Sequence, residues 1–111
     1  MTRRAAWTAV ALGIAACSVT THYKYPEDLG SENYLKRSYA ASRFARERDA
    51  AHASEAFPLL NDEHITLRAM VHRALRDLSD GEDFGYRPDL EEGDRERLAR
   101  RWQHWWEQER G

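Results

Sequence analysis

The stretch that decides the fold of this chain is residues 61–81, NDEHITLRAMVHRALRDLSDG. Four apolar side chains recur there at helical intervals and share one face of a helix: Leu67, Val71, Ala74 and Leu78. Asn61 or Asp62 can cap the start of this helix, and Gly81 follows its last turn as a stop signal. The spacing therefore predicts an amphipathic helix whose apolar face packs against other helices.

A second helix is expected upstream, between Ser31 and Phe57, where the chain contains no glycine or proline. Ser31 can cap it. Pro58 is expected to end or bend it, because the residue before a proline avoids the helical region. This segment has a charged middle, which is typical of a solvent-exposed face and consists of Arg43, Arg46, Glu47, Arg48 and Asp49.

A third helix is expected to begin at Asp94, in DRERLARRWQHWWEQERG. Leu98, Trp102 and Trp105 share its apolar face and are predicted to join the core by covering the end of the other helices. The preceding loop, EDFGYRPDLEEG at residues 82–93, is predicted to pack as an aromatic corner. No stretch has a strand pattern, so the predicted fold class is all-α: a short helical hairpin with a C-terminal capping helix.

The first sixteen residues, MTRRAAWTAVALGIAA, have the composition of an export signal. Arg3 and Arg4 give a basic start, and an uncharged, mostly apolar run of 12 residues follows. This run is short, because a helix that spans a membrane needs about 20 apolar residues. We therefore expect residues 1–16 to be a signal peptide that is cleaved between Ala16 and Cys17.

The sequence at this boundary, IAAC at residues 14–17, resembles the lipobox of bacterial lipoproteins. In that family the peptide is cut before the cysteine, whose thiol carries a diacylglycerol. The resemblance implies that Cys17, the only cysteine of the chain, is lipidated. It also implies a lipid-anchored protein of the cell membrane or outer membrane that faces the periplasm or exterior. The alternatives are an ordinary export signal with a chance cysteine, or a buried apolar cysteine.

After cleavage, residues 17–30 are predicted to form the lipid attachment site and a flexible tether, because Pro26 and Gly30 interrupt any regular pattern. Residues 31–111 would then form one α-helical domain. This length allows one small domain at most.

Residues 50–107 resemble a HEAT-type helical repeat, in which the first helix ends in Leu-Leu and an Asp turn and the second carries an early Arg. The matching residues are Leu59, Leu60, Asp62, Leu67, Arg68, Ala74, Leu75 and Leu78. FGY at residues 84–86 and RWQHWW at residues 101–106 resemble the closing segment of bacterial proteins with such repeats. The resemblance implies that Arg68 either pairs with an acid or holds the turn. It covers a single unit, whereas solenoids normally need about three, so the unit is either capped or completed by another molecule.

Charge and composition exclude several classes of function. Loss of Arg3 and Arg4 with the signal peptide leaves 15 basic and 19 acidic residues, a formal charge of −4. This acidic balance argues against general nucleic-acid binding, which relies on basic surfaces. The sequence contains no HExxH zinc signature, phosphate-binding glycine loop or nucleophile elbow. We therefore expect no enzymatic activity, no cofactor and no metal.

The sequence thus predicts a small helical scaffold for protein–protein contacts at a membrane, with an unidentified protein partner. Trp106 lies beside the apolar face of its helix and is the candidate partner contact. One alternative is a metal- or ligand-binding envelope protein that uses His64, His72 and His104. Another is a structural lipoprotein without a specific partner. A homo-oligomer is possible if an apolar face stays open.

Overall fold

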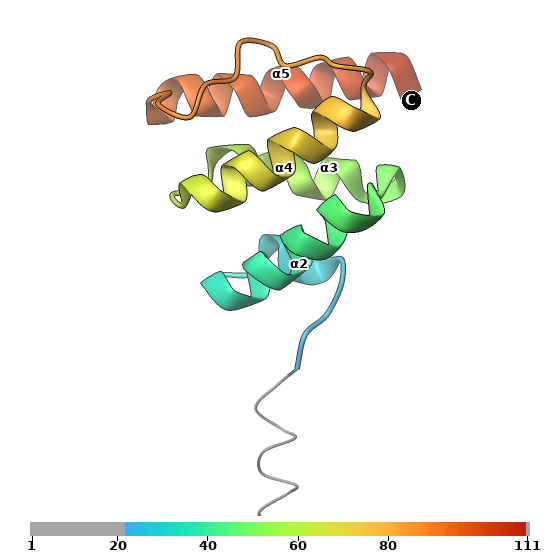
Figure 1. Ribbon diagram of the computed structural model, residues 1–111, viewed down its shortest axis with the longest axis vertical. Helices are drawn as coiled ribbons and strands as arrows, with labels where there is room; N and C mark the ends of the chain where they lie inside the picture. Colours follow the sequence, from blue (N-terminus) through green and yellow to red (C-terminus); the bar gives the residue numbers. More distant parts are fainter. Residues whose placement is uncertain (1–21, 111) are drawn as a thin grey trace, which may run out of the picture.

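The computed structural model describes residues 22–110 and is all-α in this range, with a C-terminal helix (Figure 1). This confirms the predicted fold class. The elements are, in chain order, η1 (Glu27–Gly30), α2 (Tyr34–Glu47), η2 (Ala50–His52), α3 (Ala53–Ala56), η3 (Phe57–Asn61), α4 (Ile65–Leu78) and α5 (Glu92–Arg110), where η marks a 3₁₀ helix. The predicted signal peptide, its predicted cleavage site and Cys17 lie outside the described residues.

The elements pack as two helix pairs and a final helix. The first pair is η1 with α2, and the second is the α3–η3 segment with α4. The pairs stack so that α2 lies beside α4 and α3 lies beside η1, while α5 lies against η3. Figure 1 shows α2 at one end of this stack and α5 at the other. The two ends of the stack are therefore formed by different parts of the chain, α2 near the start of the described residues and α5 at their end.

The prediction of a single helix between Ser31 and Phe57 is wrong. α2 begins after Asn33, whose side-chain oxygen accepts a hydrogen bond from the backbone N–H of Lys36, and it ends at Arg48, which adopts a left-handed conformation with φ of 45°. The chain then turns through η2 into α3 and η3. Pro58 lies in the first turn of η3, where the missing N–H of a proline costs no hydrogen bond.

The break is held by Asp49, which follows Arg48. Its carboxylate accepts a hydrogen bond of 2.7 Å from the hydroxyl of Tyr25 and lies 2.7 Å from Nδ1 of His52. Tyr25 belongs to the segment before η1, so the contact joins the two sides of the turn. A carboxylate satisfied by two neighbours stabilises a turn that lacks the glycine usually found at a left-handed residue.

The predicted tether is too long. Residues 25–30 belong to the folded part of the chain, because Leu29 in η1 is only 1% exposed and lies in the core. The carboxylate of Asp28 accepts a hydrogen bond from the backbone N–H of Lys24, which fixes the start of the segment. The buried Leu29 and the hydrogen-bonded carboxylate of Asp28 outweigh the irregular composition that suggested a flexible linker.

The predicted core residues of α4 and α5 contact the core of the stack. Leu67, Val71, Ala74, Leu98 and Trp102 are buried, whereas Leu78 and Trp105 are half-buried and pack at its edge. The loop before α5 also contributes aromatic contacts. The Phe84 ring meets that of Trp102 edge-on, with 4.8 Å between their centroids. The Trp102 ring also stacks on that of Phe57 in η3, which attaches α5 to the second pair.

Candidate functional site

Three arginines from three helices meet at the turn between η3 and α4. Arg37 of α2 donates from Nε to Oδ2 of Asp62 at 2.8 Å. Arg68 of α4 donates from Nη1 to the backbone carbonyl of Asp62 at 2.7 Å, and Arg95 of α5 donates from Nε to Oδ1 of Asn61 at 3.1 Å. We call these five residues the arginine-bound turn. It ties all three long helices to one point.

Electrostatics favour an ionised carboxylate at this turn. Burial by itself would raise the pKa of Asp62. Hydrogen bonds from the backbone N–H of His64, from Arg37 and from the His64 ring outweigh this effect and hold the pKa of Asp62 below its usual value. Arg68 also reaches the carbonyl of Pro88 at 3.3 Å, so the loop before α5 is attached to the same turn. Arg68 therefore joins the turn to this loop.

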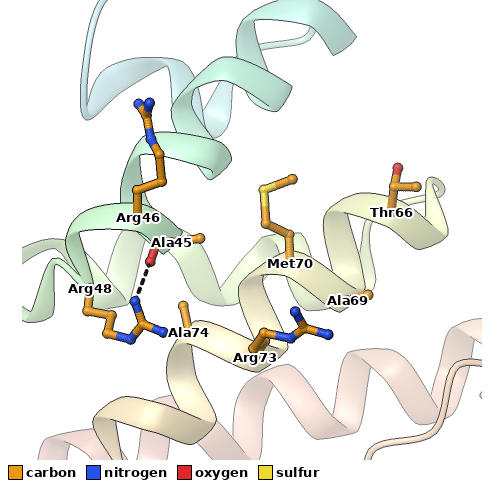
Figure 2. Close-up of a pocket in the computed structure, with 8 residues that line it drawn as sticks. All are labelled: Ala45, Arg46, Arg48, Thr66, Ala69, Met70, Arg73 and Ala74. Carbon is orange, nitrogen blue, oxygen red and sulfur yellow. Dashed lines mark hydrogen bonds between the residues drawn. The ribbon is translucent and has the colours of Figure 1, made fainter.

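A groove of about 550 Å³ runs along the seam between α2 and α4 (Figure 2). Figure 2 shows Met70 extending from α4 toward α2, with Ala45 on the facing helix. The groove is lined by three alanines, one methionine, one threonine and three arginines: Ala45, Ala69, Ala74, Met70, Thr66, Arg46, Arg48 and Arg73. Small side chains leave the seam open, and the polarisable Met70 adapts to apolar contacts of varied shape.

The groove carries positive charge on a chain whose net charge is −2. Arg48 pairs with Asp77 of α4 at 2.6 Å, which links the two helices across one end of the seam. Within residues 22–110, neither Arg46 nor Arg73 forms an ion pair, and both are exposed. The groove therefore combines an apolar floor with two arginines that are available to an anionic partner.

Sequence reasoning missed this groove. Arg46 and Arg48 were assigned to a solvent-exposed charged face, and Ala45 and Ala69 were not singled out. The only sequence signal was the presence of small residues on outward positions of both helices. That signal has meaning only once it is known which faces of α2 and α4 meet, and the predicted hairpin does not specify those faces.

The predicted partner contact, Trp106, is half-buried on α5. Its ring meets that of Phe57 edge-on, with 6.0 Å between centroids, and the Arg110 guanidinium lies 4.5 Å from the ring centroid. Neighbouring side chains therefore already use much of the indole surface. A partner contact at Trp106 stays a prediction, but the groove offers the more open surface.

The three histidines of the metal-binding alternative have different surroundings. His64 precedes α4 and has its ring tilted against that of Tyr34, His72 is buried on α4, and His104 is exposed on α5. In the part of the chain that the structure describes, no three His, Cys, Asp or Glu side chains are grouped to hold a metal ion. The arrangement gives the metal-binding alternative no support.

Comparison of the chain with protein-family models, with characterised proteins and with solved structures finds no match in any of the three. Among residues 22–110, no helix has both the length and the apolar character needed to cross a membrane.

One buried group gives the fold a pH dependence. His72 stacks on Tyr86 with 3.8 Å between ring centroids, and its Nδ1 has no hydrogen-bond partner within the described chain. Burial lowers the pKa of His72, with nearby Arg76 acting in the same direction and Asp83 opposing it. The folded state therefore keeps this imidazole neutral at a pH at which the unfolded chain takes up a proton.

We predict that lowering the pH destabilises the folded wild-type protein more than it destabilises a His72→Phe variant. His72 contributes stability above its unfolded pKa of about 6.5, and this contribution is lost as the pH falls below that value. The urea midpoint of unfolding is measured at about pH 7.5 and about pH 5.5. Between these two pH values it should fall less for the variant than for wild type. His104→Gln, at an exposed site, is the control and should keep the wild-type dependence. An equal fall of the urea midpoint for His72→Phe and for wild type would contradict the prediction.

Proposed function

We propose that this chain is a lipid-anchored protein of the bacterial cell envelope, a small helical scaffold whose α2–α4 groove binds a segment of a partner protein. The sequence IAAC at residues 14–17 supports the anchor. More than one acyl chain is needed for stable membrane attachment, and a lipidated Cys17 would supply two or more. The stacking of two helix pairs against a final helix supports the HEAT-like interpretation.

The groove is the observation that carries the binding role. Its apolar floor between two exposed helices is a surface on which an amphipathic helix can lie, with apolar side chains toward Met70 and the alanines. Binding at such a seam needs no catalytic group. It needs only that α2 and α4 stay at a fixed separation, which the arginine-bound turn provides through Arg37 and Arg68.

The charge of the groove indicates the chemistry of the partner. A helix with carboxylates flanking its apolar face would place them beside Arg46 and Arg73, which have no ion-pair partner within residues 22–110. A basic helix would be repelled there. We therefore infer an acidic, amphipathic partner segment.

The anchor is tested by palmitate labelling with membrane fractionation of wild type and a Cys17→Ala variant. We expect wild type to take up label and to sediment with membranes, because the thiol of Cys17 is the attachment point. The variant should lose the label and at least most of the membrane association. An unlabelled wild-type protein would contradict the lipid anchor and leave the N-terminal segment an ordinary export signal.

The groove is tested by photo-crosslinking in cells from Thr66, on the groove edge, and from Gln103, on the exposed side of α5. We expect a defined crosslinked species from Thr66 only. Reversing Arg46 and Arg73 to Glu should reduce its yield at least about tenfold, because carboxylates would then face carboxylates. The same reversal at Arg97 and Arg100 on α5 is the matched control and should leave the yield unchanged.

A crosslink that survives the groove reversal, or that forms equally from Gln103, would contradict binding at the groove. The absence of any species from either position would favour a structural lipoprotein without a specific partner. Circular dichroism of each variant shows whether the fold is kept. We expect it to be, because all four arginines are exposed.

A further inference from the structure

The two ends of the helical stack have opposite surface character. At the α2 end, Leu35 and Tyr39 are each 59% exposed, and Tyr23 is 47% exposed. Leu35 and Tyr39 are one helical turn apart, on the side of α2 opposite the buried Ala41 and Phe44. This end of the stack therefore presents large apolar side chains to its surroundings.

The α5 end presents charged and polar side chains. The exposed residues of this helix include Glu96, Arg97, Arg100, Gln103 and Glu107. Arg100 pairs with Glu96, and Gln103 donates to Glu107. A polar outer face is what a terminal helix of a stack needs when it meets water. The α2 end differs, because the first half of α2 exposes Leu35 and Tyr39 and only its second half exposes charged residues, Arg43, Arg46 and Glu47.

Basic side chains surround the aromatic residues at the α2 end. The rings of Tyr23 and Tyr39 lie 4.6 Å apart, and the guanidinium of Arg43 lies 4.5 Å from the ring of Tyr25. A shallow depression of about 200 Å³ between them is lined by three basic residues, Lys24, Arg43 and Arg46, and by one buried acid, Asp28. Arg43 pairs with Glu47. Within the described residues, Lys24 and Arg46 form no ion pair.

Tyrosines beside lysine and arginine suit the headgroup region of a membrane. A tyrosine keeps its ring among apolar groups and its hydroxyl in water, and basic side chains pair with anionic headgroups. The described chain begins beside α2, at the end of the stack opposite α5 (Figure 1). His22 is five residues after Cys17, and five residues span at most about 18 Å. A lipid on Cys17 would hold this end within that distance of the bilayer surface.

We propose that the α2 end of the stack, formed by Tyr23, Leu35, Tyr39, Lys24 and Arg46, rests on the headgroups of an anionic phospholipid membrane. This inference rests on the proposed lipid anchor. The anchor supplies attachment, and the α2 end supplies orientation: α5 points away from the membrane. The α2–α4 groove, which shares Arg46 with the docking face, then opens close to the membrane surface.

The experiment uses the full chain extracted from membranes and reconstituted in vesicles of phosphatidylethanolamine and phosphatidylglycerol. Nitroxide labels are placed at Tyr39→Cys and, as the control, at Gln103→Cys. A lipidated Cys17 has no free thiol, so wild type should take no label and each variant should take one. Label accessibility to a water-soluble nickel complex is then measured in vesicles and in detergent.

We expect accessibility at position 39 to fall at least about threefold in vesicles relative to position 103, since the headgroups cover only the α2 end. The fall should be smaller in vesicles of phosphatidylcholine, because a zwitterionic surface attracts Lys24 and Arg46 less. Far-ultraviolet circular dichroism of Tyr39→Cys checks that the exposed substitution leaves the helices intact.

Each contrary result identifies what failed. A label on wild-type Cys17 would show a free thiol and would overturn both the anchor and the docking inference. An unlabelled wild type with equal accessibility at positions 39 and 103 would leave the anchor standing and overturn docking alone. Dipolar broadening between labels at position 39 would place a second copy on this face and would also overturn membrane docking.

Discussion

The arginine-bound turn is the constraint on which the rest of the structure depends. Asn61 and Asp62 lie where η3 passes into α4, and arginines from α2, α4 and α5 all donate to them. Apolar burial drives the helices together but does not fix their relative positions, because it has no direction. Charge-assisted hydrogen bonds to one buried turn do have direction. Removing one partner of a buried pair typically costs about 3–5 kcal/mol, so the turn links helix positions to overall stability.

This constraint connects the fold to the proposed function. A chain of 111 residues has little core to spare, and its helices are short. Holding α2 and α4 at one turn keeps their seam open over alanines, where larger side chains would close it. It also fixes which faces point outward: aromatic and basic at α2, charged and polar at α5. The proposed anchor at Cys17 would precede the proposed docking face and the groove in the chain, and these last two share Arg46.

The sequence predicted best where local periodicity and burial agree. The α4 helix, its apolar face and the Trp102 contact to the core all follow from helical spacing and from residues that have little alternative to burial. The break after α2 was missed because its cause is not local. Arg48 is left-handed without being glycine, and the turn is held by a hydroxyl from Tyr25, 24 residues before Asp49. The groove was missed for the same reason, since it depends on which faces of the two helices meet, and the predicted hairpin does not specify those faces.

The central claim is that the arginine-bound turn fixes α2, α4 and α5 relative to one another. Amide hydrogen exchange of wild type and of a double variant, Asn61→Ala with Asp62→Ala, tests it most directly under native conditions, because the two substitutions remove the side-chain acceptors of Arg95 and Arg37. If the claim holds, amides of α2, α4 and the first turns of α5 lose protection together in the variant. Loss of protection confined to the first turn of α4, with α2 and α5 unchanged, would show that the turn is a local cap and would contradict the account.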